Sequence, residues 1–325
     1  MPLSAKEERQ IVFASTLGTL FEWYDFYIYG SLAVFMSSVL FPPNNPTAAL
    51  LASLGALTAG FVVRPLGALF FGYLGDRLGR KWTFLLTVMM MGGGTFFMGC
   101  LPSYSYAGNL SWILLVVLRL IQGLAVGGEY GGAVIYIAEQ CGPRRRGLLT
   151  SWIQVTGSTG LLVCLLVILV TQSFITTEQF KEWGWRVPFL LSFVLLVVST
   201  YIRSKLHESP VFTRMKAEKK LSENPIRDAF TKLPNLKLML LALVGITAGM
   251  GANYFTGQFY VMIFLQQAVL IDQATVYKLV MGSFIVAAPA YVFFGWLSDR
   301  WGAKWIMMAG LFLAAICYRP MFAEL

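Results

Sequence analysis

Five ionisable side chains lie inside long apolar stretches of the sequence: Glu22, Asp25, Arg64, Arg119 and Glu129. A charged side chain near the centre of a lipid bilayer costs about 2.5–3.5 kcal/mol on insertion scales, because hydrocarbon cannot solvate it. Such residues therefore pair with one another, face a water-filled cavity, or do both. Their types indicate two kinds of chemistry, which are proton exchange at the acids and carboxylate binding at the arginines.

Helical spacing indicates which of these side chains can meet. Glu22, Asp25 and Tyr29 stand three and four residues apart in sequence, which places them on one stripe of a helix. Counted at about 1.5 Å per residue from the basic turns, Arg64 and Glu129 lie at a similar depth to the two acids. We therefore expect a cluster of opposite charges in one layer of the bundle.

Two interpretations fit Glu22, Asp25 and Glu129. A carboxyl group that moves between a desolvated position and one beside a guanidinium changes its affinity for protons. It can then take up a proton on one side of the membrane and release it on the other. Alternatively, the acids form permanent ion pairs that fix the register of the helices. We expect proton coupling, with the proton as the coupling ion and no other cofactor.

The two arginines and several amides and hydroxyls are candidates for substrate binding. A guanidinium matches a carboxylate in bidentate geometry, although Arg64 and Arg119 could instead neutralise Asp25 and Glu129 permanently. Buried polar residues also hold membrane helices together by hydrogen bonds. The candidates for a substrate cavity are Arg64, Arg119, Gln122 on the same face as Arg119, Tyr29, Gln154, Tyr254 and Gln258.

The composition places these residues in a membrane protein. Of the 325 residues, 57% are hydrophobic and only 13% are charged, whereas roughly 25% are charged in a soluble domain. A helix needs about 20 residues to cross the hydrocarbon, and no segment alternates as a membrane β-strand does. We predict an all-α polytopic membrane protein with spans near residues 12–38, 48–74, 82–101, 111–138, 148–171, 185–203, 237–265, 275–297 and 303–320.

The basic residues predict the orientation of the chain. Most lysines and arginines lie at the N-terminus and in alternate loops, including the stretch from Arg203 to Lys237. By the positive-inside rule this places the N-terminus in the cytoplasm, so the net charge of +9 needs no nucleic-acid partner. The 4 cysteines lack metal-ligand spacing, and no nucleophile–base pair or phosphate-binding loop suggests an enzyme.

An internal repeat predicts the architecture. The string GYLGDRLGRK at 72–81 recurs as GWLSDRWGAK at 295–304, six predicted spans later. This indicates two parallel halves, namely an N-terminal six-helix bundle at 1–203, a cytoplasmic linker at 204–236 and a partial C-terminal bundle of three spans at 237–325. The second half is about three helices shorter than the first, so we expect a chain truncated at its C-terminus.

Both decapeptides resemble the loop signature of the major facilitator superfamily. FEWYDFYIYG at 21–30, VRPLGALFFG at 63–72, RLIQGLAVGGEYGGA at 119–133, WGWRVP at 183–188 and ESPVF at 208–212 resemble the metabolite:proton symporter family. Its members include permeases for α-ketoglutarate, citrate, shikimate and proline/betaine. The resemblance covers nearly all of residues 11–325. It implies a major-facilitator-type helical bundle in the bacterial inner membrane that works by alternating access, and Gln154 is similar to a cavity glutamine of the superfamily.

The charged turns at the ends of the spans are candidates for conformational latches. An aspartate beside helix termini and basic residues makes charge-assisted hydrogen bonds that exist in one access state. The resemblance implies that the first-half turn latches against a helix of the second half. For Glu139 and the basic residues Arg144–Arg146, the alternative is a plain solvated loop. The candidates are Asp76, Arg77, Arg80, Glu139, Arg146, Asp299 and Arg300.

The expected function is therefore proton-coupled uptake of a small organic acid or a zwitterionic osmolyte. The expected partners are this small-molecule substrate, carboxylate or betaine-like, and the lipid bilayer. A drug/proton antiporter is less favoured, because such exporters carry a Gly-Pro motif in span 5, whereas SWIQVTGSTGLLV at 151–163 has no proline. The other alternative is a truncated, non-transporting membrane protein, whose unfinished bundle would need an oligomer or a complementing chain.

Overall fold

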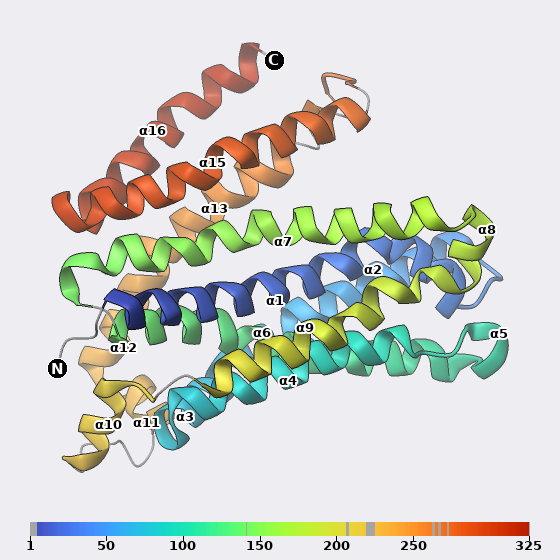
Figure 1. Cartoon of the computed structure of the whole chain (residues 1–325). Coiled ribbons are helices and arrows are strands. Elements are labelled where there is room, and N and C mark those ends of the chain that lie inside the picture. Colours follow the sequence, from blue (N-terminus) through green and yellow to red (C-terminus); the bar gives the residue numbers. More distant parts are fainter. Residues whose placement is uncertain are drawn as a thin grey trace. The chain divides into compact units, whose positions relative to one another are not determined.

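The computed structural model describes residues 5–140, 142–205, 208–218, 225–261, 264–265, 268–271 and 273–324. Within these ranges the regular secondary structure is helical and includes no strand (Figure 1). Among the described residues, eight helical stretches are long and apolar enough to cross a membrane. The prediction of an all-α polytopic membrane protein is confirmed.

These eight stretches correspond to eight of the nine predicted spans. The remaining predicted span, 12–38, lies within α1 (Ala5–Leu40), a helix of 36 residues. At 1.5 Å per residue α1 is roughly 54 Å long, so its length is sufficient. Its acids Glu22 and Asp25 and its tyrosines and serines lower its hydropathy, which separates α1 from the other stretches. The one predicted span that is not among the eight apolar stretches is thus the span that carries two of the predicted coupling acids.

Contacts divide the chain into two compact units. The first comprises Met1–Gly142 and Thr156–Leu221, and the second Pro143–Val155 and Ser222–Leu325. The predicted domain boundaries at residues 203 and 236 stay predictions. The first unit contains α1, α2 (Pro46–Val62), α3 (Arg64–Leu78), α4 (Arg80–Gly99), α5 (Tyr104–Ala107), α6 (Asn109–Gln140), the later part of α7 (Arg146–Phe174), α8 (Thr177–Gln179), η2 (Phe180–Gly184), α9 (Arg186–Ser204) and α10 (Pro210–Ala217).

The second unit holds three of the apolar stretches, Leu233–Tyr254, Lys278–Trp301 and Ala303–Glu324. Its elements are η1 (Pro143–Arg145), the first turns of α7, α11 (Pro225–Thr231), α12 (Leu233–Ala242), η3 (Leu243–Ala248), α13 (Gly249–Phe255), η4 (Thr256–Tyr260), α15 (Gln273–Trp301) and α16 (Ala303–Glu324). The first stretch is built from α12, η3 and most of α13, because the π-helical segment η3 interrupts its α-helical hydrogen bonding. A second π-helical segment, η4, follows α13.

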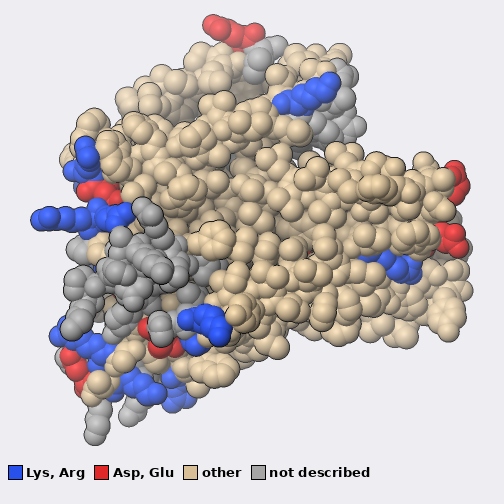
Figure 2. All heavy atoms as spheres, viewed as in Figure 1, with Lys and Arg blue, Asp and Glu red and all other residues tan. Residues whose placement is uncertain are grey.

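The first unit is apolar both in its core, which is aromatic and aliphatic, and on its outer surface. Tyr24 and Met36 of α1 and Trp185 beside α9 are fully buried. Large hydrophobic residues along the outer helix faces are exposed, among them Leu166, Leu169, Val194 and Val197. Figure 2 shows the helix flanks mostly in tan, with Lys and Arg gathered near the end that carries α10. An apolar flank with charged ends is the surface that a bilayer solvates.

The second predicted span is broken into α2 and α3 at a proline. Pro65 lies in the first turn of α3 and has no backbone N–H to bond the preceding turn. Val63, which ends α2 and precedes α3, stays in the right-handed helical region at φ −84° and ψ −9°. Arg64 therefore lies at a junction between two helices, inside the apolar stretch Pro46–Leu78.

Glycines allow α6 to pack against this junction at backbone distance. A Cβ at Gly127 would overlap the carbonyl oxygen of Arg64, and a Cβ at Gly123 would overlap the carbonyl oxygen of Gly60. The same holds from the other side, where Gly67 lies against the carbonyl of Leu124. The small-residue face that the sequence places on the fourth span thus packs directly on α2 and α3, as close helix pairs in membranes do.

We predict that Gly127→Ala and Gly131→Ala have opposite effects on stability. The first forces α6 away from the Arg64 carbonyl and should lower the free energy of unfolding by about 1–3 kcal/mol. At Gly131 nothing lies within 4 Å of the added Cβ, so the better helix propensity of alanine should leave stability unchanged or raise it by up to about 1 kcal/mol. Thermal unfolding of both variants in one detergent measures this. Equal loss in both would contradict the packing.

Candidate functional site

Three charged side chains from three helices meet inside the first unit. Arg203, in the last turn of α9, forms salt bridges with Glu22 of α1 at 3.2 Å and with Glu129 of α6. The three residues are 2%, 7% and 0% exposed. We call Arg203, Glu22 and Glu129 the triad. Arg203 is the last residue of the predicted span 185–203 and was also counted with the basic loop that follows. The structure places it inside α9 and buried, so it does not belong to that loop.

The neighbouring backbone makes room for the Arg203 guanidinium. A Cβ at Gly18 of α1 would overlap the guanidinium nitrogens. The carbonyl of Phe84 in α4 accepts a hydrogen bond from Nη1 of Arg203 at 3.5 Å, and the centroid of the Phe84 ring lies 5.0 Å from Cζ. Two features of the sequence could have indicated this site. One is an arginine at the end of an apolar run, and the other is a glycine one turn before the first acid, Glu22. Neither is specific.

Asp25 lies one turn beyond Glu22 on α1. Its Oδ1 accepts a hydrogen bond from Oγ of Ser192 in α9 at 2.7 Å, and the residue is 5% exposed. Glu22 and Asp25 both line a cavity of about 20 Å³ between α1, α4 and α9, which is roughly the space of one water molecule. The two acids of the predicted stripe therefore face one small space.

Arg119 and Gln122 of α6 form a second polar group. Nη1 of Arg119 donates a hydrogen bond to Oε1 of Gln122 at 3.0 Å, and Nε2 of Gln122 donates to Oγ1 of Thr95 at 2.5 Å. The Tyr29 ring lies under the guanidinium, with 3.5 Å from Cζ to the ring centroid, and the Tyr29 hydroxyl donates to the Ser53 carbonyl at 2.9 Å. The structure thus brings together Arg119, Gln122 and Tyr29.

Arg64 lies beside this group, at the α2–α3 junction. Its guanidinium carbon is 4.0 Å from the centroid of the Phe61 ring and 5.0 Å from that of Phe26. Arg64, Arg119 and Gln122 line one cavity of about 10 Å³. Nε of Arg64 and Nε and Nη2 of Arg119 are buried without a hydrogen-bond partner. Buried donors are normally satisfied, so these nitrogens are available to a hydrogen-bond acceptor.

The pairing of acids with arginines differs from the one considered from the sequence. Glu129 is neutralised by Arg203, and Arg64 packs on aromatic rings instead. For Arg119 the physical reason is depth, because Arg119 precedes Glu129 by ten residues on α6, which is roughly 15 Å along the helix axis. Arg119 is therefore on the level of the Arg64 cavity, and Glu129 is on the level of the last turn of α9.

The remaining candidates for the substrate cavity belong to the second unit. Gln154 of α7 and Tyr254 of α13 are half-buried there. The side chain of Gln258 lies outside the described residues. The cavity beside Arg64 and Arg119 is lined by residues of the first unit, so a substrate-binding role for the other three stays a prediction.

Asp76, Arg80 and Glu139 form a charge network at the start of α4. Nη2 of Arg80 lies 2.9 Å from Oδ1 of Asp76 and 3.8 Å from Oε1 of Glu139. Oγ of Ser209 donates a hydrogen bond to the second oxygen of Glu139 at 2.6 Å. This network joins the last turn of α3, the start of α4, the end of α6 and the N-cap of α10.

Glu208 caps the N-terminus of α4. Its carboxylate accepts hydrogen bonds from the backbone N–H of Arg80 at 2.9 Å and of Lys81 at 3.3 Å. An acid at this position is favoured by the partial positive charge of a helix N-terminus. Gly79 permits the approach, since its φ is +108° and a Cβ there would overlap the Glu208 carboxylate. The string ESPVF at 208–212 was singled out only because it resembles the metabolite:proton symporter family, and the capping role of Glu208 was missed.

The second copy of the decapeptide also holds a helix terminus. Asp299 accepts hydrogen bonds from the backbone N–H of Gly147 at 2.7 Å and of Leu148 at 2.8 Å, which are in the first turn of α7. A Cβ at Gly147 would overlap Ser298 and the Gly295 carbonyl. The aspartate of this turn thus makes the charge-assisted bonds to a helix terminus that were predicted for it. Its role as a latch between access states stays a prediction.

Three basic residues of the predicted latches have other surroundings. Nη1 of Arg77 donates a hydrogen bond to the Tyr73 hydroxyl at 2.5 Å. Arg300 lies over the Trp296 ring, with 4.0 Å from Cζ to the centroid. Arg146 is the exposed first residue of α7. Their gating roles remain untested.

The sequence was compared with known proteins. Residues 11–235 match the family described as Sugar (and other) transporter. The chain is 40% identical over 232 residues to the inner membrane metabolite transport protein YhjE of Escherichia coli K12, covering 71% of this chain and 52% of that protein. It is 35% identical to the shikimate transporter of the same organism, over 99% of this chain and 74% of that protein.

A putative proline/betaine transporter of Staphylococcus aureus (strain COL) is 32% identical, over 95% of this chain and 66% of that protein. The chain thus spans about half the length of the first of these relatives and 66% to 74% of the other two.

Solved structures show the same fold. The major facilitator superfamily proton:xylose symporter XylE, bound to 6-bromo-6-deoxy-D-glucose, superposes with a TM-score of 0.67 over 92% of this chain and 70% of that one. A partially occluded, inward-open XylE from E. coli gives a TM-score of 0.60. The sequence identities are 16% and 19%, so these likenesses concern the fold alone.

The capping geometry predicts the effect of Asp299→Asn. Loss of the carboxylate weakens two bonds to the N-terminus of α7 and should lower the free energy of unfolding by about 1–2 kcal/mol. Asp228→Asn is the matched control, because Asp228 pairs with Lys232 at the surface and should change stability by less than about 1 kcal/mol. Chemical or thermal unfolding measures both. A loss at Asp228 as large as that at Asp299 would contradict the cap.

Proposed function

Because the chain belongs to the sugar (and other) transporter family of the major facilitator superfamily, we propose that it imports a small organic acid or zwitterion together with a proton. Transport needs no bond chemistry, only two access states and a site that both ligands bias. The proposal has three parts, which are the substrate class, the substrate site and the coupling acids.

The named substrates of two relatives support the substrate class. Shikimate is a carboxylic acid, and proline and betaine are zwitterions that carry a carboxylate. A carboxylate is the group that these three compounds have in common. We therefore assign this chain a substrate with a carboxylate and leave the rest of its structure open.

The observation that carries the proposal is the pair of arginines at one cavity. Arg64 and Arg119 come from different helices, and each keeps at least one buried guanidinium nitrogen without a partner. A guanidinium binds a carboxylate through two parallel hydrogen bonds. The Tyr29 ring holds Arg119 from one side, and Phe26 and Phe61 hold Arg64. The cavity of about 10 Å³ admits one water molecule, so a change of access state must widen it for a substrate.

Asp25, Glu22 and Glu129 are the proposed coupling acids. Asp25 is the one with a hydroxyl partner, Ser192, and with a small cavity at its side. A monoanion imported with one proton moves no net charge, so the pH difference alone drives it. A zwitterion with one proton moves one positive charge, and each 100 mV then adds about 2.3 kcal/mol.

The relatives also support a location for the proposal. One of them is named as an inner membrane protein of a bacterium, and this chain is embedded in a membrane by eight apolar helical stretches among its described residues. We propose the bacterial inner membrane with the N-terminus in the cytoplasm, where the positive-inside rule places it.

Uptake into liposomes tests the function. The full chain is reconstituted, and radiolabelled shikimate, proline, glycine betaine and xylose are offered under an inward proton gradient. We expect accumulation of at least one of the three carboxylates, no accumulation of xylose, and loss of accumulation when a protonophore collapses the gradient. Asp25→Asn should reduce accumulation to the level of empty liposomes, because a neutral amide carries no proton, whereas the surface variant Asp228→Asn should match the unmodified chain.

Two results would contradict the proposal. Accumulation of a carboxylate that is insensitive to the protonophore would exclude proton coupling. Accumulation that survives Asp25→Asn would remove Asp25 from the coupling mechanism. Clamping the membrane potential at zero then separates the substrate types, because zwitterion uptake should fall and monoanion uptake should not.

A further inference from the structure

The triad holds two acids and one base among buried side chains. Arg203 contacts Glu22 and Glu129 at once, and none of the three is more than 7% exposed. The triad carries a net charge of −1 when both acids are ionised and no net charge when one acid holds a proton. A desolvated site strongly favours the neutral arrangement.

The surrounding elements supply no second base to the triad in the described part of the chain. From α4 the neighbour is Phe84, through its carbonyl and its ring. From α1 the next charged group is another acid, Asp25, across the small cavity. From α9 the neighbour is the hydroxyl of Ser199, and from α6 it is Glu129 itself. Arg203 neutralises one of the two acids, so the charge of the other acid is neutralised by a proton.

Two polar atoms, one in the triad and one next to it, lack hydrogen-bond partners. Oε2 of Glu129 and Oγ of Ser199 are buried without a hydrogen bond. Ser199 lines the same cavity as Glu22 and Asp25, so a hydroxyl and two carboxyl groups face a space of about 20 Å³. A water molecule there would have polar partners on both sides, which connects Asp25 to the triad.

We propose that Glu22 and Glu129 share a single proton against Arg203, and that this pair exchanges the proton with Asp25 through the cavity that Glu22 and Asp25 both line. In the step, a proton leaves the Asp25 carboxyl and adds to the Glu22 carboxylate. Asp25 is left as a carboxylate that accepts the Ser192 hydrogen bond, and the triad becomes neutral. Arg203 is the positioning residue, because it holds both acids together and sets how many protons they carry.

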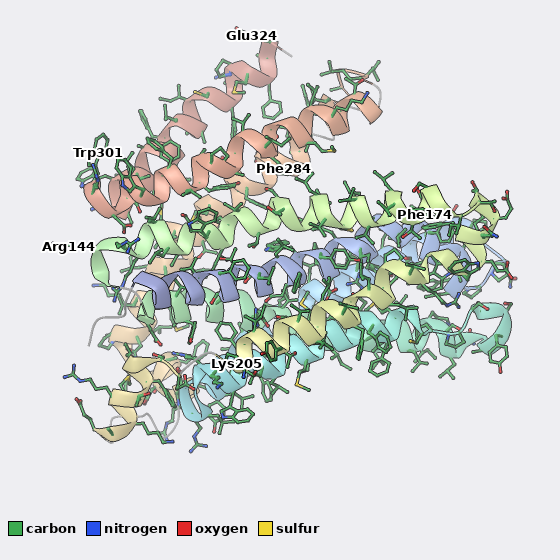
Figure 3. The ribbon with its side chains drawn as sticks, viewed as in Figure 1. Arg144, Phe174, Lys205, Phe284, Trp301 and Glu324 are labelled. Atoms are coloured by element: carbon green, nitrogen blue, oxygen red, sulfur yellow. The ribbon has the colours of Figure 1, made fainter. Side chains whose placement is uncertain are left out.

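The inference rests on the proposed proton-coupled function for its purpose, but its test needs no transport. Arg203 lies near the end of α9, two residues before Lys205, and Phe174 ends α7 toward the other end of the bundle (Figure 3). With the N-terminus in the cytoplasm, the triad is the relay between Asp25 and the cytoplasmic surface. The triad is thus the last buried group that binds the proton before it reaches the cytoplasm.

Infrared spectroscopy of the purified full chain in lipid nanodiscs counts the protonated carboxyl groups at neutral pH. We expect a carboxyl C=O band that Glu22→Gln and Glu129→Gln each abolish, because the remaining acid then pairs one-to-one with Arg203 and ionises. Arg203→Met removes the base, so both acids should take up protons and the band should double. Arg203→Lys should restore the single-proton intensity.

Arg186→Met, on the same helix, is the matched control and should leave the band unchanged. The proposal is overturned if the unmodified chain shows no band that responds to either glutamine variant, or if Arg203→Met leaves the intensity as it was. The two glutamine variants keep the test decisive if Arg203→Met does not fold. Failure of proton-driven uptake with the infrared result intact would reject the proposed function alone.

Discussion

The absence of solvating water inside a membrane bundle is the constraint on which this structure depends. Each buried charge must find an opposite charge, a hydrogen bond or a proton, because hydrocarbon offers none. The triad meets this requirement for Glu22 and Glu129 through one shared base, and Ser192 meets it in part for Asp25. Helices α1, α6 and α9 are therefore tied together by the ion pairs of the triad.

Close backbone packing makes this arrangement possible. Gly18 leaves the space that the Arg203 guanidinium occupies, and Gly127 allows α6 to lie directly on the α2–α3 junction. The second contact fixes the level of α6 relative to Arg64, and hence the level of Arg119 and Glu129 as well. The polar side chains of the first unit then lie at two levels along the helices, with the cavity of Arg64 and Arg119 at the first level and the triad at the second. In the proposed function, the substrate binds at the first of these levels and the proton at the second.

Much of this could be predicted from the sequence, and the missing part has a specific cause. Apolar runs located the spans, and the spacing of Glu22, Asp25 and Tyr29 on α1 located the polar stripe. Arg203 was misjudged because it ends an apolar run and is followed by Lys205, which is the pattern of a loop boundary. Residue counts from the basic turns do not show how α9 packs against α1 and α6, and only that packing reveals that this arginine is buried. The role of Glu208 was missed because its hydrogen-bond partners, the backbone N–H groups of Arg80 and Lys81, are 128 and 127 residues away in the chain.

A thermodynamic cycle on the triad is the most direct measurement of whether these charges depend on one another. The free energy of unfolding is measured for Arg203→Met in the unmodified chain and in a chain in which Glu22 and Glu129 are both glutamine. If the acids are stabilised by Arg203, its loss should cost about 3–5 kcal/mol in the first background and about 1 kcal/mol or less in the second. An equal cost in both backgrounds would mean that the three side chains do not act together, and the central claim would fail.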